Sequence, residues 1–163
     1  MAFLISIGTF STFAYQTYLI QKQQYANTMP YLILSGELEG GGAYPINRLY
    51  LSNKGVGPAF IETVKIRYQD SVYEQNPSSF YFSSVEHPDS ANYAIDSGYT
   101  PEGYAVSAGE RILLIGPASE YSASVLNELF FGQKKAVIEI TYSSIYDEVW
   151  RISSEDYLPE KVE

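Results

Sequence analysis

The sequence has no cysteine, a single histidine and few basic residues. The absence of cysteine excludes disulfides, thiol catalysis, zinc–thiolate sites and a lipid-modified N-terminal cysteine. Ten lysines and arginines stand against 19 aspartates and glutamates, so the formal net charge is −9. A nucleic-acid-binding protein needs a basic surface, and none is present here. The same negative charge opposes adsorption of the domain to anionic lipid.

Motifs of catalysis and metal binding are missing as well. His87 is the only histidine, so a His–His metal site or a catalytic triad would have to depend on that residue. The chain contains no G-x-S-x-G elbow, phosphate loop, H-E-x-x-H motif or calcium loop. Asp89–Gly98 offers oxygen ligands, but not at the calcium-loop spacing. We therefore expect no enzyme, no cofactor, no metal and no small-molecule substrate.

Hydrophobic and aromatic residues are plentiful. They make up 45% and 15% of the chain, and tyrosine alone accounts for 16 of 163 residues, which is enough to fill a core. Tyrosine favours strands, and its ring can be half buried while the hydroxyl stays wet. This composition favours a mainly β fold of the sandwich type.

The N-terminal segment is uncharged as far as Gln21. As a helix, Ala2–Ile20 would span about 28 Å, close to the thickness of the hydrocarbon core of a bilayer. Tyrosines and Lys22 at its C-terminal end resemble an interfacial belt. A cleaved signal peptide is a second interpretation, but it would show a basic start and a small-x-small cleavage site, and neither is visible. A buried core helix is the third interpretation. We predict a transmembrane helix with a polar stalk in residues 1–28.

Three small residues of this helix lie on nearly one face. Gly8 and Thr12 form a small-x-x-x-small pair with Ser11 beside them, and such faces let helices approach closely in lipid. The alternative is that the hydroxyls bond back to their own helix. The predicted partners are the lipid bilayer and other integral membrane proteins.

The orientation of the predicted helix rests on few charges. Lys22 is the only nearby basic residue, on the side of the domain, which favours a cytoplasmic domain. Large domains, however, cross membranes largely regardless of charge, and this one is acidic. We expect a single-pass protein of the bacterial cytoplasmic membrane with its domain on the periplasmic side.

Short apolar runs separated by turn signals follow Pro30 and define a predicted β-domain over residues 29–155, with an acidic tail over 156–163. About seven antiparallel strands suit an immunoglobulin-like sandwich. On one strand we expect Phe60, Val64, Ile66 and Tyr68 to face inward and Ile61 to face outward. The seven expected strands are Tyr31–Leu38, Arg48–Asn53, Phe60–Tyr68, Tyr104–Ser107, Glu110–Ile115, Ala136–Tyr142 and Val149–Ile152. We consider Ser71–Glu74 as a return strand after a turn at Gln69-Asp70, and we expect a second turn at Ala108-Gly109.

The remaining segments of the domain show other patterns. Asn76–Thr100 is rich in polar residues and proline, and we interpret it as a long excursion with a helical turn that starts at Pro77. Apolar residues at helical spacing from Tyr121 to Phe130, followed by Gly132, predict one short helix. The last two expected strands form a closing hairpin, with Trp150 and Ile152 inward on the second strand and, on the first, Ala136, Ile138, Ile140 and Tyr142. Trp150, the only tryptophan, is expected to anchor the core.

Two stretches resemble a known kind of protein. Leu49–Ile61 (LYLSNKGVGPAFI) and Ile138–Ile152 (IEITYSSIYDEVWRI) resemble the N-x-G-x-G-P-A turn and the closing hairpin of uncharacterised bacterial proteins. Those proteins have one N-terminal membrane helix and a small immunoglobulin-like β-sandwich. The segment QTYLIQKQQYANTMPYL is similar to their junction between helix and first strand. The resemblance implies a fold and no activity.

The N-x-G-x-G-P-A motif also has a physical explanation of its own. Asn53 can cap a turn, Gly55 and Gly57 are expected at positive φ, and Pro58 stiffens the start of the next strand. A strand follows the two glycines and the third glycine is absent, so this is not a dinucleotide fingerprint. The motif predicts a connection between strands.

The leading hypothesis is a non-enzymatic interaction module, an accessory subunit of a bacterial membrane protein complex. The alternative is a surface ligand-binding or adhesive β-sandwich domain. An enzyme of unrecognised type would need a deep pocket with converging acids or His87.

Overall fold

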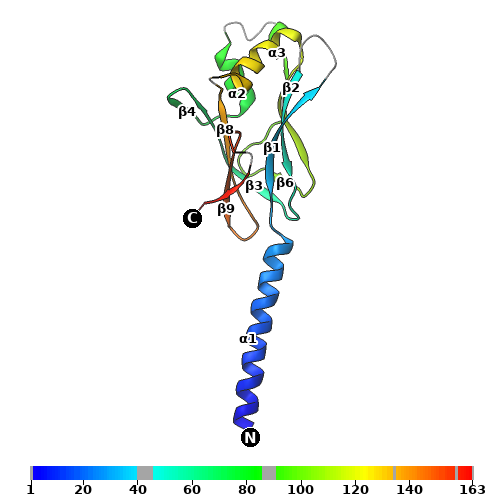
Figure 1. Cartoon of the computed structure of the whole chain (residues 1–163), viewed down its shortest axis with the longest axis vertical. Helices are drawn as coiled ribbons and strands as arrows, with labels where there is room; N and C mark the ends of the chain where they lie inside the picture. Colours follow the sequence, from blue (N-terminus) through cyan, green and yellow to red (C-terminus); the bar gives the residue numbers. More distant parts are fainter. Residues whose placement is uncertain (1, 40–45, 86–90, 134, 157, 163) are drawn as a thin grey trace.

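The computed structural model describes residues 2–39, 46–85, 91–133, 135–156 and 158–162. A long N-terminal helix projects from one end of a domain built of two β-sheets and a few short helices (Figure 1). The prediction of a mainly β fold with an N-terminal helix is confirmed. The described residues form ten strands, against about seven expected, because several of the strands have only two or three residues.

Helix α1 runs from Ala2 to Asn27 and so includes the predicted polar stalk. It ends just before Pro30, which lacks the backbone N–H that a continuing helix would need and also restricts the residue before it. The chain then turns into the first strand. His87 and the acidic residue Asp89 lie outside the described residues.

The first sheet contains four antiparallel strands in the order β1-β2-β7-β5. Strands β1 and β2 pair along their whole length, from Leu32 opposite Asn53 to Glu39 opposite Ile46. Leu49 and Leu51 are buried as the alternation predicts. The strands are β1 (Leu32–Glu39), β2 (Ile46–Asn53), β7 (Arg111–Pro117) and β5 (Ile95–Asp96).

The second sheet has the order β10-β9-β8-β3-β4, and β6 also pairs with β3. Its last edge strand, β10, comes from the segment predicted as an acidic tail. The expected turn at Gly109 is present, but it joins β6 of this sheet to β7 of the other. The strands are β3 (Ala59–Tyr68), β4 (Ser71–Tyr73), β6 (Ala105–Val106), β8 (Val137–Ser143), β9 (Val149–Ser153) and β10 (Glu160–Lys161).

Strand β3 departs from its predicted alternation. Ile61 is 1% exposed, although the uninterrupted period placed it on the outer face, and Phe60 is only partly buried. The pairing of β3 with β8 shifts register between Ile61 and Thr63. An extra residue in one strand reverses which side chains face inward beyond it. The first half of β3 is therefore out of phase with the prediction, while Ile66 in the second half is buried as expected.

The closing hairpin follows the predicted pattern. Ala136, Ile138, Ile140 and Tyr142 are all at most 1% exposed, and Ile152 is buried opposite them. Trp150 is only partly buried against this core. Its Nε1 has no hydrogen-bond partner among the described residues, and Lys161 Nζ lies 5.7 Å from the ring centroid.

Short helices cover the end of the domain opposite α1 (Figure 1). The predicted polar excursion contributes to the core, because Phe80 and Tyr81 of α2 are buried. In the second predicted helix, Leu126 and Phe130 are buried whereas Tyr121 is 51% exposed. The helices are α2 (Pro77–Ser84), the 3-10 helix η1 (Ala91–Tyr93), α3 (Glu120–Leu126) and the π-helix η2 (Asn127–Phe131).

Candidate functional site: the junction between the N-terminal helix and the β-domain

Asn53, at the end of β2, is the centre of the junction. Its side chain is fully buried. The Oδ1 atom accepts hydrogen bonds from Gly55 N at 2.9 Å and Tyr31 N at 3.2 Å. The Nδ2 atom donates to the carbonyls of Gly57 at 2.8 Å and Val106 at 2.9 Å. One amide thus uses four bonds to join the start of β1, the β2–β3 connection and β6.

Gly55 and Gly57 allow the β2–β3 connection to approach the backbone of Thr28–Tyr31 closely. Neither has the positive φ that we predicted; among the described residues, the glycines with positive φ are Gly103 and Gly109. A Cβ on Gly55 would lie 2.4 Å from Met29 O, and a Cβ on Gly57 would lie 1.9 Å from Thr28 O. Both glycines therefore leave room for the chain where it leaves α1.

The same two segments are joined by backbone hydrogen bonds. Lys54 N donates to Tyr31 O at 2.8 Å, and Val56 N donates to Met29 O at 3.1 Å. Gly57 N makes a third, longer bond to Met29 O at 3.4 Å. The N-x-G-x-G-P-A motif thus holds the exit of α1 against the domain, in addition to linking β2 with β3.

Three tyrosines strengthen the attachment of the chain at this end. Tyr25 of α1 contacts Tyr146 of the β8–β9 turn, with ring centroids 4.3 Å apart. The hydroxyl of Tyr142 accepts a hydrogen bond from Leu32 N at 3.3 Å. Burial raises the pKa of Tyr142 to about 12, so this hydroxyl stays protonated at neutral pH.

The turn between β6 and β7 completes the junction. Gly109 N donates to Asn53 O and Asn53 N donates to Glu110 O, both at 2.9 Å. The Glu110 carboxylate accepts from Ser107 N at 2.7 Å and from the Tyr104 hydroxyl at 2.8 Å. The bond from Ser107 N, and after it the bond from the Tyr104 hydroxyl, holds the pKa of Glu110 below its usual value, because hydrogen bonds to a carboxylate favour its charged form.

We expect the contribution of Glu110 to stability to depend on pH. A lowered folded-state pKa means that the stabilisation is present above the unfolded-state pKa and is lost as pH falls through the folded-state pKa. Wild type should therefore be more stable than Glu110→Gln at about pH 7, and the difference should shrink below about pH 4.5. Urea unfolding at a series of pH values checks this, and a difference that stays constant down to about pH 3 contradicts it.

The predicted helix-packing residues lie on the freely projecting part of α1. Thr12 Oγ1 donates to Gly8 O at 2.9 Å, so these two residues are neighbours one turn apart, as the spacing predicts. Apart from the adjacent backbone of α1 itself, a Cβ on Gly8 would meet no described atom within 4 Å. Ser11 is exposed beside them. Whether this face packs against another helix stays a prediction.

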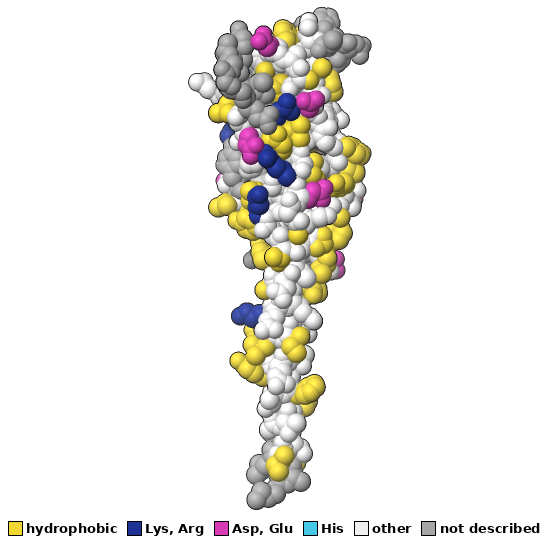
Figure 2. All heavy atoms as spheres, turned by 90° about the vertical axis from the view of Figure 1, so that its right-hand side faces the viewer, with side chains coloured by type: hydrophobic (Ala, Val, Ile, Leu, Met, Phe, Trp, Pro, Cys, Tyr) yellow, Lys and Arg dark blue, Asp and Glu magenta, His cyan; other side chains and the backbone are white. Residues whose placement is uncertain are grey.

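Helix α1 is exposed along almost its entire length. Every side chain from Ile5 to Asn27 is exposed, and Phe3, Phe10 and Phe13 are each at least 70% exposed. The apolar side chains are spread around the helix instead of forming one stripe, and Figure 2 shows them scattered along the narrow part of the molecule.

The described part of the chain contains no helix that is both long and apolar enough to cross a membrane. This finding does not support the predicted transmembrane placement of residues 1–28.

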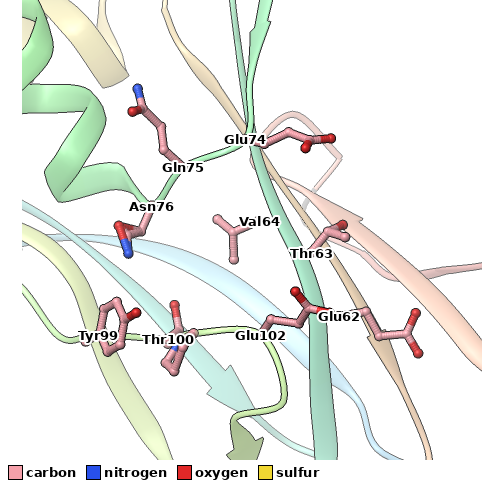
Figure 3. A pocket seen from close by; sticks show the side chains of 10 residues that line it. Glu62, Thr63, Val64, Glu74, Gln75, Asn76, Tyr99, Thr100 and Glu102 are labelled. Carbon is pink, nitrogen blue, oxygen red and sulfur yellow. The ribbon is translucent and has the colours of Figure 1, made fainter.

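An open hollow of about 440 Å³ lies beside β3 and β4 (Figure 3). Glu62, Glu74 and Glu102 line it, but their carboxylates do not converge on one point in Figure 3. Glu74 pairs with Lys65 at 3.1 Å. Within the described residues, no group of three or more acids and histidines is arranged to hold a metal. The hollow therefore lacks the converging acid pair that hydrolytic chemistry of the glycosidase type needs.

Comparison with known proteins adds no further similarity: no protein family, curated protein or solved structure matches the chain. The resemblance to bacterial proteins with an N-terminal membrane helix stays a prediction.

The motif indicated this region, but its partners were missed. Sequence reasoning placed Asn53, Gly55 and Gly57 in a turn without assigning them to the exit of α1. The sequence does contain a signal for this contact. Gly55 and Gly57 flank a single residue shortly after Asn53, and glycines so placed are also typical of a close approach of two backbone segments. The role of Glu110 had no comparable signal.

Proposed function

We propose that this protein is a non-enzymatic interaction module anchored in a membrane by α1, and that it is an accessory subunit of a bacterial membrane protein complex. The observation that carries the proposal is the projecting helix, whose apolar side chains are exposed on all sides. Exposed apolar surface of this extent marks a site of contact with protein or lipid.

The character of α1 supports burial in lipid. Its apolar side chains point in all directions and its own domain does not cover them, whereas a surface helix of a globular protein usually gathers them in one stripe that faces the core. In Ala2–Ile20, the polar residues other than tyrosine are serine and threonine with the single exception of Gln16. Thr9, Thr12 and Thr17 each donate a hydrogen bond of 2.9 Å to the carbonyl four residues earlier, so their hydroxyls are satisfied within the helix, as hydrocarbon requires.

The domain supports a role in binding proteins. The acids of the hollow beside β3 and β4 are dispersed, and hydrogen bonds join the domain to the exit of α1. We propose the immunoglobulin-like sandwich as its topology, since two antiparallel sheets are joined by connections that cross between them. The proposed location is the bacterial cytoplasmic membrane, with the domain on the periplasmic side.

Carbonate extraction tests the membrane anchor. We expect the full chain to stay with the membrane pellet and the chain that begins at Met29 to be soluble, because deletion of residues 1–28 removes the exposed apolar helix. Release of the full chain into the supernatant would contradict the anchor. Self-association of that released chain through α1 would then assign the helix to a bundle between copies.

Copurification in mild detergent tests the subunit role. The double variant Gly8→Leu with Thr12→Leu should still insert into the membrane, because leucine favours insertion by a few tenths of a kcal/mol. It should copurify with less of its partners, because bulky side chains separate the helices. Ser6→Leu with Thr17→Leu is the matched control, since helical periodicity puts both on the opposite side. Equal loss of partners in both double variants would contradict a specific packing face.

A surface ligand-binding domain is the second candidate function, favoured by the hollow of Figure 3. Tyr99 is 70% exposed and lines it together with Glu62 and Glu102, an arrangement that suits a cationic or sugar-like group. Full-length protein that purifies without stoichiometric partners, and whose binding to a surface is lost in Tyr99→Ala, would favour this candidate.

A further inference from the structure

We propose that the end of the domain next to α1 sits in the interfacial layer of the lipid bilayer and contacts lipid through an apolar collar, defined as Tyr25, Val56, Ile145 and Tyr146. The inference rests on the proposed membrane anchor and adds to it a lipid-binding surface on the domain itself. This contact would set the orientation of the domain relative to the membrane.

The collar consists of apolar side chains that the fold leaves in solvent. Val56, at the tip of the β2–β3 connection, is 63% exposed. Ile145 and Tyr146, in the β8–β9 turn, are 45% and 37% exposed, and Tyr25 of α1 is 45% exposed. Tight turns ordinarily present polar residues and glycine to water. Two turns at the same end of the domain instead present valine, isoleucine and tyrosine.

Both turns are fixed at the level of the last turn of α1. Val56 N is bonded to Met29 O at 3.1 Å, and the ring of Tyr146 lies 4.3 Å from that of Tyr25. In Figure 1 the β8–β9 turn forms the end of the domain nearest to the helix, and Figure 2 shows hydrophobic side chains where the domain narrows into the helix. The collar therefore cannot move away from the membrane independently of α1.

The length of the stalk places the collar at the right depth. The uncharged segment ends at Gln21, and Tyr25 follows four residues later, which is about 6 Å along a helix. The polar layer on each side of a bilayer is about 5–7 Å thick. Tyr25 and the adjoining Tyr146 thus fall within that layer, where tyrosine is favoured because its ring is apolar and its hydroxyl is polar.

The chemistry of the collar selects uncharged lipid surface as its partner. The chain has a formal charge of −9, which opposes electrostatic attraction to anionic headgroups. Contact through apolar and tyrosine side chains needs no lipid charge. We therefore commit to a zwitterionic lipid surface, and phosphatidylcholine alone suffices as the probe.

The absence of cysteine allows a direct test on the full chain. Single variants Val56→Cys and Ile145→Cys are labelled with a small environment-sensitive fluorophore and reconstituted into phosphatidylcholine vesicles with bromine on the acyl chains near the headgroup. Val72→Cys is the matched control, because Val72 is 61% exposed and belongs to β4, away from α1 in Figure 1. Phe13→Cys reports on the helix itself.

We expect the brominated lipid to lower the fluorescence at positions 56 and 145 about twofold relative to unbrominated lipid, since interfacial groups bury about 5–10 Å into the headgroup boundary. Position 72 should be unaffected. Quenching at position 13 but not at 56 and 145 would overturn the collar and leave the anchor intact. An unquenched label at position 13 would overturn the proposed anchor together with the collar. Equal quenching at position 72 would show non-specific contact of the domain and would also overturn the collar.

Discussion

Replacement of Asn53 by alanine is expected to lower the free energy of unfolding of the β-domain by about 3 kcal/mol or more. The amide makes four hydrogen bonds from a fully buried position. Alanine would leave the carbonyls of Gly57 and Val106 and the N–H of Tyr31 without these partners. Each buried group left unsatisfied costs about 1–3 kcal/mol. Urea unfolding followed by fluorescence measures the loss.

Asn47→Ala is the matched control for Asn53→Ala. Asn47 is a partly buried asparagine of the same strand whose Nδ2 donates to Asn127 Oδ1 at 2.7 Å. Loss of such a bond between two side chains at a partly wet site should cost about 1 kcal/mol or less. If both variants lose the same stability, Asn53 does not have the central role that its four bonds indicate.

The second large effect is expected for Gly57→Ala. The three atoms nearest to a Cβ added at Gly57 all belong to Thr28, and the Thr28 carbonyl oxygen would lie 1.9 Å from that Cβ. Backbone atoms cannot yield as a flexible side chain does, so the exit of α1 must shift and the bonds to Met29 O weaken. We expect a loss of about 3 kcal/mol in the full chain. In a chain that begins at Met29, Thr28 is absent, and the same substitution should cost less than about 1 kcal/mol.

Gly55→Ala gives the contrast. An added Cβ there would clash with Met29, Pro30 and Tyr31, which the shortened chain retains. This variant should therefore be destabilised in both chains. Gly36→Ala controls for the change of residue alone, because its Cβ would meet only the Phe131 ring at 3.3 Å. A Gly57→Ala cost that is the same in both chains would show that Thr28 is not the cause.

Several elements followed directly from local pattern. The predicted inward residues of β8 and of Ala136 just before it alternate without interruption and are buried. Helix α1 was predicted from an uncharged segment that ends shortly before Pro30. The turns at Gln69, with φ 53°, and at Gly109, with φ 78°, were also placed correctly. In each case the cause lies in residues adjacent along the chain, so the periodicity or the turn residue is sufficient.

Other features depend on residues distant in sequence. The bulge in β3 is defined by its pairing with β8, and nothing in FIETVKIRY marks the extra residue. The contribution of α2 to the core was underestimated, because Phe80 and Tyr81 lie in a segment of mostly polar residues. They become buried only when the other elements pack against them. The exposed position of Tyr121 likewise reflects which face of α3 meets the domain.

The N-terminal helix, the mainly β domain, the net negative charge and the lack of a recognised catalytic motif can be predicted from the sequence, since these properties depend on composition and short-range period. The contacts of Asn53, Gly55 and Gly57 with the exit of α1 are visible only in the folded chain, because their partners at Thr28–Tyr31 and Val106 are separated from them by 22 or more residues along the chain. A hydrogen bond or a steric limit between distant segments exists only once the two sheets have brought them together.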